Sequence, residues 1–565
     1  MEGVNIVPRA GDGRRVAPVA CIFLGIWAAA IPGLAQETAN AACTSCHDIE
    51  KKLQKSGHST VSCQTCHIKH ENYPHAEGIP KPVCASCHEQ VAAEHARGIH
   101  GQEARKGNSA APECGTCHGA AHEVQTTGSA AFRASVPETC GMCHSDVATA
   151  FQASVHGKAV ARGVLQAPVC TDCHGEHSIL PPSNAASPVS RQNIRDTCGA
   201  CHGDVRLARK FGFPSDRLVS FDASFHGLAA KSGSQTVANC ASCHGVHNIL
   251  PSSDPRSTVH PKNLAATCGR CHPGAGKRFA IGHVHLTEAR AESAAVSWVR
   301  QTYLWLIPFT IGLMLLHNAG DWARKLHRLR LSRTALRGNP PAGEPQFRMF
   351  GFERLQHALL AISFLTLVWS GFALKYPDQW WARPMLLWES TGHVRSIVHR
   401  IAAVVFIAVA FMHAISLFAS ARLRRHWKGL LPKAQDIRDG VGGLGYNVGL
   451  LSERPALPEH SYIEKAEYWA VVWGAVVMMV TGVTLWANDF AMAWMPKSVL
   501  DVATSVHFYE AVLATLAILV WHFYSVIFDP DVYPLDTAAI SGFSTRPRDV
   551  EPETVQESEE LATKS

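Results

Sequence analysis

The apolar positions of the chain separate it into two different halves. Five long apolar segments follow Trp298, covering about residues 299–319, 354–374, 394–418, 465–487 and 503–528. Each is near the roughly 20 residues that a membrane-spanning helix requires. Before Trp298 the one comparable apolar run covers residues 16–31. The pattern predicts a mainly α protein with a five-span transmembrane helical bundle in its second half.

Basic residues gather in two of the loops between these segments. The loop 321–350 and the loop after Phe418 carry Arg324, Lys325, Arg328, Arg330, Arg333, Arg337, Arg348, Arg422, Arg424, Arg425 and Lys428. Basic loops stay in the cytoplasm, so an odd number of spans puts the N-terminal half outside and the C-terminus inside. We expect a multi-pass protein of the bacterial inner membrane, with its first half in the periplasm.

Both ends of the chain have a distinctive composition. Arg14 and Arg15 precede the N-terminal apolar run, and Gly33-Leu34-Ala35 offers a small-residue cleavage site. These features predict a signal peptide over residues 1–35, with an uncleaved membrane anchor as the alternative. The acidic stretch 549–560 has no apolar pattern. It predicts a disordered cytoplasmic tail over residues 536–565.

Residues 36–295 carry nine copies of Cys-x-x-Cys-His, which use eighteen of the nineteen cysteines. The copies are Cys43/Cys46/His47, Cys63/Cys66/His67, Cys84/Cys87/His88, Cys114/Cys117/His118, Cys140/Cys143/His144, Cys170/Cys173/His174, Cys198/Cys201/His202, Cys240/Cys243/His244 and Cys268/Cys271/His272. This is the attachment pattern of c-type haem, in which two thiols bind the porphyrin and the adjacent histidine binds the iron. Zinc sites and disulfides also use paired cysteines, but neither requires the histidine that follows every pair. We therefore predict a periplasmic cytochrome c domain with nine covalent haem c groups.

This domain repeats internally. The pattern Cys-x-x-Cys-His-Gly-x-His-x-Ile-Leu-Pro occurs from Cys170 and again from Cys240, 70 residues later. Residues 36–295 are too few to build a conventional core around nine cofactors. The haems must therefore supply most of the buried apolar surface. We expect a haem-packed domain with little regular structure.

Thirteen further histidines of this domain are candidates for the second axial position: His58, His70, His75, His95, His100, His122, His156, His177, His226, His247, His260, His283 and His285. Those that recur with the repeat are the preferred ligands: His100, His122, His156, His177, His226 and His247. A haem with histidine on both faces exchanges electrons but has no open position for a substrate. The excess of histidine favours electron transfer, and one haem lacking its sixth ligand stays open as an alternative.

The predicted spans also contain histidines: His357, His399, His413, His507 and His522, with His317 near the end of the first span. Histidine is costly inside a membrane unless it serves a function. The predicted topology puts His357 and His522 near the inner face, and His399 and His507 near the outer face. His507 and His522 are 15 residues apart, which is about 22 Å along a helix. Depth thus predicts an outer haem b on His399 and His507 and an inner haem b on His357 and His522, with His413 opposite His522 as the alternative.

Several of these residues stand in recognisable motifs. Phe-Glu-Arg-Leu-Gln-His at 352–357, His399-Arg400 and the last two histidines resemble the cytochrome b subunits of membrane formate dehydrogenases and nickel-iron hydrogenases. The resemblance covers about residues 350–535 and implies two haem b groups in a diheme domain over 351–535, with a menaquinone site beside the inner one. Residues 296–350 then hold an additional span and a basic cytoplasmic loop. The whole fusion is similar to the inner-membrane quinol dehydrogenases of metal-respiring bacteria.

These features predict membrane quinol:cytochrome c-type electron transfer in anaerobic respiration. Quinol from the membrane quinone pool is oxidised near the inner haem b, and electrons pass through two b haems and nine c haems to a periplasmic cytochrome or reductase. The same wire in reverse, a terminal multihaem reductase with one open haem, and a subunit of a larger complex are the alternatives. No catalytic residue and no nucleic-acid partner are predicted.

Overall fold

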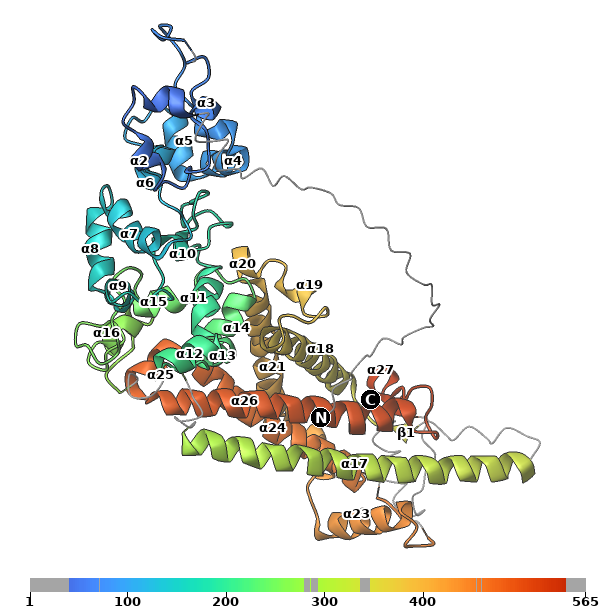
Figure 1. Cartoon of the computed structure of the whole chain (residues 1–565). Coiled ribbons are helices and arrows are strands. Elements are labelled where there is room, and N and C mark those ends of the chain that lie inside the picture. The colour runs from blue at the N-terminus through green and yellow to red at the C-terminus, as the bar shows by residue number, and fades with distance from the viewer. Residues whose placement is uncertain are drawn as a thin grey trace, which may run out of the picture. The chain divides into compact units, whose positions relative to one another are not determined.

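The computed structural model describes residues 40–70, 72–278, 285, 293–335, 346–453, 455–458 and 460–544. These residues are mainly helical, and their only strands are β1 (Gln346–Phe347) and β2 (Phe543–Ser544) (Figure 1). The predicted fold class is therefore confirmed. The predicted signal peptide lies outside the described residues. Contacts divide the chain into two compact units, Met1–Thr139 and Cys140–Ser565, whereas the division predicted near residue 295 follows composition and stays a prediction.

The first unit consists of short helices joined by loops. They are α2 (Glu50–Leu53), α3 (Cys63–Cys66), η1 (Cys84–Ser86), α4 (Glu89–Arg97), α5 (Ile99–Arg105), α6 (Cys114–His118) and α7 (Ala130–Gly141), of which α7 crosses into the second unit. Several of these helices are single turns that coincide with an attachment motif. This unit therefore has the little regular structure that the sequence predicts.

The second unit begins with a further series of short helices. They are α8 (Ser145–Ala153), α9 (Val155–Ala161), α10 (Cys170–His174), α11 (Ile194–His202), α12 (Val205–Phe211), α13 (Arg217–Ala223), α14 (Phe225–Lys231), α15 (Cys240–His244) and α16 (Leu264–Gly269). Helices α10 and α15 are the same motif in the two copies of the repeat. The structure thus gives equivalent sequences the same local fold.

A tight elbow between helices recurs with the repeat and positions one histidine in each copy. Ser154 caps α9 by accepting a hydrogen bond from the Gly157 backbone N–H, and Ser224 caps α14 in the same way. A Cβ on Gly157 would lie 2.1 Å from the carbonyl oxygen of Phe151, in the preceding helix. Only glycine permits this close approach, which places the preceding residue, His156, at the start of the new helix.

The remainder of the second unit is a bundle of long apolar helices. Its elements are α17 (Ala294–Ala335), α18 (Gly351–Lys375), α19 (Arg383–Leu386), α20 (Glu389–Gly392), α21 (Val394–Ala419), α22 (Ala421–Lys428), α23 (Ala434–Asn447), α24 (Tyr462–Trp486), α25 (Asn488–Trp494), α26 (Lys497–Ala517), η2 (Ile518–His522), η3 (Tyr524–Phe528) and α27 (Ala538–Ser541). In the described residues, five helices are long and apolar enough to cross a membrane. They coincide with the five predicted segments, which are confirmed as apolar helices.

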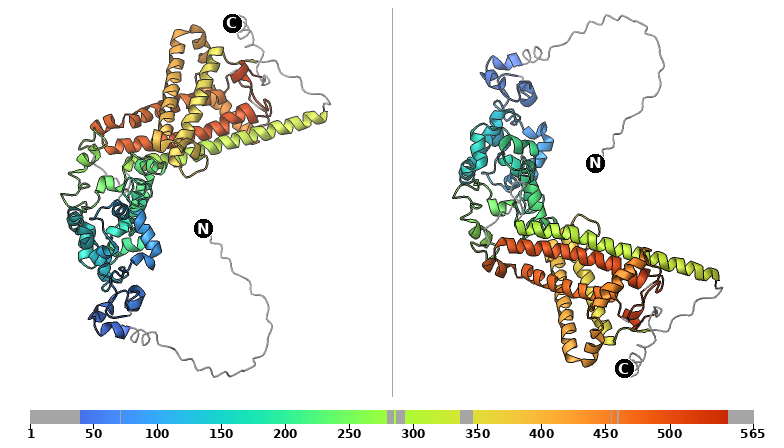
Figure 2. Two further views of the ribbon diagram at one scale, coloured as in Figure 1. Left: turned by 90° about the horizontal axis from the view of Figure 1, so that it is seen from above. Right: turned by 90° about the horizontal axis from the view of Figure 1, so that it is seen from below.

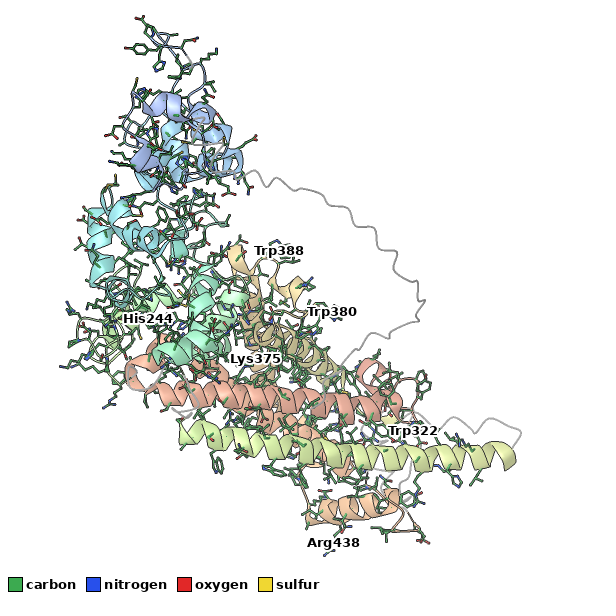
Figure 3. The ribbon with its side chains drawn as sticks, in the orientation of Figure 1. His244, Trp322, Lys375, Trp380, Trp388 and Arg438 are labelled. Atoms are coloured by element: carbon green, nitrogen blue, oxygen red, sulfur yellow. The ribbon has the colours of Figure 1, made fainter. Side chains whose placement is uncertain are left out.

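These helices pack in two groups. Helix α18 packs against α21, while α26 packs against both α24 and α17, which runs alongside it (Figures 1 and 2). Large apolar side chains on the outer faces are exposed, as lipid contact requires. Trp380 and Trp388 are exposed near α19 and α20, and Trp322 is exposed toward the end of α17 (Figure 3). Such tryptophans are typical of the two interfaces of a bilayer.

The structure differs from the predicted boundaries at two places. Helix α17 continues through residue 335, into the segment that the sequence pattern assigned to a loop, because arginine, lysine and leucine sustain a helix in water. Residues 536–544, which were assigned to the tail, include α27 and β2, and β2 pairs with β1. The folded chain therefore extends beyond the predicted start of the tail, and residues 545–565 lie outside the described residues.

Candidate haem-binding site

The attachment motifs form short helical turns that present their cysteines and histidine together. In the described residues none of the eighteen motif cysteines forms a disulfide. No group of three or more metal-binding side chains converges there as a zinc site needs. The disulfide and zinc interpretations of the motifs therefore find no support in the described residues.

The second cysteine of each Cys-x-x-Cys-His motif is poorly buried by the polypeptide. This is unexpected for the interior of a domain unless a cofactor fills it. A haem bonded to these sulfurs would cover them, so the low burial agrees with a domain in which cofactors supply the core. The second cysteines Cys46, Cys66, Cys87, Cys117, Cys143 and Cys271 are exposed, and Cys173, Cys201 and Cys243 are half-buried.

Histidine rings of the first unit face one another in pairs. A metal–imidazole bond is about 2 Å long and the bonded nitrogen lies about 1 Å from its ring centre, so two imidazoles across one iron have centroids about 6 Å apart. The centroid distances are 6.2 Å for His47 and His75, 5.9 Å for His67 and His122, and 6.1 Å for His58 and His88. Each pair joins a motif histidine to one of the thirteen others. This spacing fits a haem between the two rings.

The second unit contains four further pairs with the same spacing. The centroid distances are 6.0 Å for His174 and His247, 6.2 Å for His156 and His202, 6.2 Å for His226 and His272, and 6.3 Å for His244, labelled in Figure 3, and His285. Burial lowers the pKa of His156 and of His285 to about 4. Both rings are therefore neutral at pH 7, which is the form that binds a metal.

His118 and His144, the histidines of the fourth and fifth motifs, are not in the seven ring pairs described above. His118 stacks on the Phe132 ring at 5.5 Å. His144 is exposed, directly precedes α8 and lies within electrostatic range of His174. No part of the described polypeptide buries the His144 side chain. A bound haem would be the group that covers this ring. The roles of His118 and His144 as haem ligands stay predictions.

The pairs include four of the six preferred distal histidines, namely His122, His156, His226 and His247. The sequence pattern did not favour His58, His75 or His285, because the opening motifs and the end of the domain lie outside the repeat. Two motif histidines, His67 and His174, pair with a histidine just after the second following motif. This rule does not reach His285, because its partner His244 belongs to the eighth motif and only one motif follows it. His100 recurs with His156 and His226, and His177 recurs with His122 and His247. The roles of His100 and His177 as distal ligands stay predictions.

Consecutive attachment motifs lie in contact. Thiols of neighbouring motifs are within hydrogen-bonding range at Cys43 and Cys63, Cys84 and Cys114, Cys140 and Cys170, and Cys198 and Cys240. Each of these sulfurs would hold the edge of one haem. If a haem is attached at each motif, these contacts would bring the edges of neighbouring haems close together within each unit.

The predicted inner pair of the membrane domain lies together in the bundle. The His357 ring on α18 is 6.2 Å, centre to centre, from the His522 ring on η2. His522 Nδ1 lies 3.2 Å from Glu467 Oε2, and a carboxylate in this position orients a ligating imidazole and leaves Nε2 for the metal. His522 also ends a π-helical turn, a feature frequent at functional sites.

The predicted outer histidines are each oriented by a hydroxyl group. His399 Nδ1 lies 2.8 Å from Ser370 Oγ, and His507 Nδ1 lies 2.9 Å from Thr481 Oγ1. Both hydroxyls donate their own hydrogen to the carbonyl one turn earlier in their helix, so each oxygen accepts from Nδ1–H. This fixes the tautomer in which Nε2 is free to bind iron. His399 and His507 also lie within electrostatic range of each other.

Glycines next to these hydroxyl residues keep space open beside the rings. A Cβ on Gly482 would lie 3.2 Å from Cε1 of His507, and one on Gly371 would lie 3.5 Å from Cε1 of His399. The first distance is tighter than most real contacts, so a larger residue would press on the imidazole. Ser370-Gly371 on α18 thus orients the His399 ring and leaves space beside it, and Thr481-Gly482 on α24 does the same for His507.

His413, the alternative partner of His522, is engaged elsewhere. Its Nε2 lies 3.0 Å from the Tyr468 hydroxyl, and its ring meets Trp427 edge to face at 4.8 Å. His357, and not His413, faces His522 in the structure. His413 therefore belongs to a polar and aromatic group beside the inner pair.

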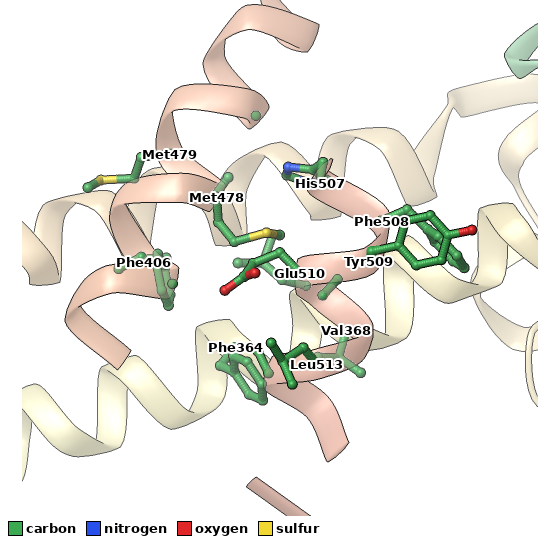
Figure 4. A pocket seen from close by; sticks show the side chains of 18 of the residues that line it. Phe364, Val368, Phe406, Met478, Met479, His507, Phe508, Tyr509, Glu510 and Leu513 are labelled. Carbon is green, nitrogen blue, oxygen red and sulfur yellow. The ribbon is translucent and has the colours of Figure 1, made fainter. Parts of the chain in front are cut away.

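Glu510 is a buried acidic residue that the sequence pattern did not single out. Tyr303 on α17 donates a hydrogen bond of 2.7 Å to Glu510 Oε2. The close view in Figure 4 shows Glu510 among Met478, Leu513 and His507. An acidic side chain within an apolar span was the available signal, because such residues usually serve a function.

One cavity of about 3260 Å³ connects the paired histidines of the second unit's bundle. Its walls include the rings of His226, His272, His399, His507, His357 and His522. The ninth attachment motif meets the bundle directly, since His272 Nδ1 lies 3.3 Å from Asp489 Oδ1 on α25. The cavity therefore runs from the ninth motif past the outer pair to the inner pair.

Residues 348–536 match the family model of prokaryotic cytochrome b561. The C-terminal region is thus a multi-pass membrane domain that is similar to the cytochrome b561 family, and this similarity suggests transmembrane electron transfer that involves haem b. All four predicted haem b histidines lie inside the matched range, and helix α17 lies before it. A search of curated proteins found no match to the chain. The orientation of the imidazoles, the 6.2 Å spacing of the His357 and His522 rings and the cavity described above fit a haem b in this matched region.

Proposed function

We propose that the chain is a membrane quinol dehydrogenase that oxidises quinol beside the inner histidine pair and delivers electrons through two haem b and nine haem c groups to a periplasmic acceptor. The observation that carries this proposal is the single cavity that links the inner pair, the outer pair and the ninth attachment motif. Bound haem supplies one-electron transfer at each of these positions. The ring pairs at seven motifs support a wire, because two axial histidines leave no open face for a substrate.

The cavity beside the inner pair has the polar groups that a quinol needs. The Tyr468 hydroxyl contacts His413 and the Tyr462 hydroxyl contacts His317, and all four residues line the cavity. Gln356, which precedes His357, is buried and its Nε2 atom has no hydrogen-bond partner in the described residues. A buried amide that lines a cavity without a partner is suited to bind a ligand oxygen. These groups would hold the quinol head with its hydroxyl groups directed at imidazoles and phenols.

The proposal includes an orientation. The basic residues at the end of α17 and after α21 support a cytoplasmic location for the end of the bundle that holds the inner pair. The c-type motifs then lie in the periplasm and the C-terminus in the cytoplasm. Electrons pass outward from a quinol site near the cytoplasmic face to acceptors outside the membrane, such as a periplasmic cytochrome or reductase.

Anaerobic mixing of the oxidised protein with a menaquinol analogue tests the function. The absorption bands of b-type and c-type haem are followed separately in the wild type, in His522→Ala and in the control His327→Ala, whose histidine lies on α17 outside the cavity. We expect b-type haem to be reduced before c-type haem in the wild type and the control, and neither to be reduced in His522→Ala. If quinol leaves both bands oxidised while the pre-reduced protein reduces quinone, the wire runs inward and the proposed direction is wrong.

A further inference from the structure

Helix α17 carries a polar stripe that the electron path does not use. The stripe consists of His317, Asn318, Asp321, Lys325 and Arg328. His317 and Asn318 are adjacent, and the later members follow at spacings of three or four residues, which puts them on one face of the helix. This helix precedes the residues that match the cytochrome b561 family. The stripe therefore lies outside the matched region and extends from the end of the first predicted span into the basic segment that follows it.

The centre of the stripe is a buried network of one lysine and three carboxylates. Lys325 Nζ lies 2.8 Å from Asp321, 2.8 Å from Asp529 and 3.3 Å from Asp531. The side chains of Lys325 and Asp529 are only 6% and 2% exposed. Three carboxylates thus surround this ammonium, and Arg328 pairs with Asp531 at the outer edge of the network.

The inner end of the stripe reaches the cavity beside the inner pair. His317 Nε2 lies 2.7 Å from the Tyr462 hydroxyl, and its ring stacks on Trp521 at 5.0 Å. All three residues line the cavity, and Trp521 Nε1 is buried there without a hydrogen-bond partner in the described residues. An unpartnered donor in this wall indicates a polar ligand next to His317.

The stripe continues from the cavity to solvent in short steps. Asp321 is one helical turn from His317, which is about 6 Å at 1.5 Å per residue. The Tyr524 hydroxyl donates a 2.7 Å hydrogen bond to Asp321 and holds its carboxylate in place. Asp531 then contacts Arg328 at 3.1 Å, and the Arg328 side chain is 55% exposed. Titratable groups thus lie in sequence from the cavity to the surface.

We propose that this stripe conducts the protons of quinol oxidation from the cavity to the cytoplasmic solvent. Oxidation of one quinol breaks two O–H bonds, giving one quinone, two electrons and two protons. The electrons leave through the inner pair, and the protons pass from His317 to Asp321, then through the network at Lys325, and reach solvent beside Arg328. The inference rests on the proposed function, because it assigns the proton route of that same quinol site.

Proteoliposomes that trap a pH-sensitive dye test the proposal. External ferricyanide, which does not cross the membrane, accepts electrons only from molecules whose c-type domain faces outward, and a menaquinol analogue is the donor. Valinomycin with potassium removes the membrane potential. In the wild type we expect the lumen to acidify by two protons per quinol. In Asp321→Asn and Lys325→Met we expect lumen acidification and quinol oxidation to slow at least tenfold, with unchanged haem content.

Asp436→Asn is the matched control. Asp436 forms a 2.7 Å ion pair with Lys465, and these side chains are 13% and 6% exposed, nearly the same as Asp321 and Lys325 at 12% and 6%. Neither control residue lines the cavity, so we expect Asp436→Asn to behave like the wild type. His317→Gln changes the stripe at a position away from the buried charges. It should slow both lumen acidification and quinol oxidation, and it keeps the test valid if Asp321→Asn loses haem.

The outcomes separate the two proposals. If wild type oxidises quinol while Asp321→Asn and His317→Gln do so at the rate of Asp436→Asn, the stripe is a structural contact and the inference is wrong. External acidification by the wild type would also overturn it. If the wild type does not oxidise quinol at all, the proposed function itself fails.

Discussion

At the scale of single residues, hydroxyl groups determine how the outer histidines meet a metal. Thr481 accepts from His507 Nδ1–H and donates to the carbonyl of Val477. Thr481→Val removes this acceptor and makes His507 a weaker electron donor to iron, so the ferric state loses stability. We expect the midpoint potential of one b-type haem to rise while the other stays unchanged. A redox titration that follows the b-type bands measures both potentials.

Thr484→Val provides the matched control on the same helix. The Thr484 hydroxyl donates to the carbonyl of Val480, and no hydrogen bond to a histidine is present at this position in the described part of α24. Equal potentials in Thr481→Val and Thr484→Val would contradict the proposed role of the Thr481 hydroxyl.

The histidines could be predicted from the sequence, but their supporting residues could not. Depth along the spans was enough to select His357 and His522, because a charged or metal-binding group in an apolar helix is conspicuous. Ser370 and Thr481 are small residues that fit an apolar helix without any special role, so their pattern carries no signal. Glu467 lies within an apolar span too, but its partner is identified only by the three-dimensional packing of α24 against the last span.

At the scale of elements, the elbow between α8 and α9 aims His156 at His202. Gly157→Ala would put a Cβ at 2.1 Å from a backbone carbonyl of α8, so the elbow must open. We expect the variant to retain less haem and to melt at a lower temperature, because the overlap involves backbone atoms that cannot rotate away. Haem content from the pyridine haemochrome spectrum and a thermal melt measure the two effects.

Gly115→Ala is the control for this prediction. Gly115 also lies in a short helix of the c-type domain, and a Cβ there would meet nothing within 4 Å. Alanine is favoured over glycine in a helix, so this variant should melt at or slightly above the wild-type temperature. A loss of stability in Gly115→Ala equal to that of Gly157→Ala would show that the elbow has no special constraint.

The length and position of the helices were largely predictable, whereas their ends and irregular turns were not. An apolar run marks a membrane span whichever residues flank it, so all five spans were visible. The extension of α17 depends on polar residues that occur equally in loops. The π-helical turns at 518–522 and 524–528 leave the composition of the span unchanged, and no apolar pattern distinguishes them.

At the scale of the whole molecule, the ninth attachment motif is one place where the c-type region of the second unit meets the bundle. The rings of His226 and His272 line the same cavity as the outer pair. Methionine in place of a histidine ligand raises the potential of a haem. We therefore expect His226→Met to trap electrons at this motif, so that quinol reduces the remaining c-type haem more slowly. Stopped-flow absorbance in the c-type band measures the delay.

His122→Met is the corresponding control, because its pair with His67 belongs to the first unit. This variant raises one potential without changing the motif at the bundle, so the early phase of c-type reduction should match the wild type. Similar delays in both variants would mean that electrons do not enter at the ninth motif.

The polar stripe and the inner pair lie at the end of the bundle that carries the basic loop, and this has a bioenergetic consequence. When quinol is oxidised there, its protons stay in the cytoplasm while two negative charges cross to the periplasm. Each electron moves toward the positive side of a membrane that is negative inside, and is driven by about 2.3 kcal/mol per 100 mV. Turnover in the proposed direction therefore consumes protonmotive force to push electrons outward, and the reverse reaction would conserve energy.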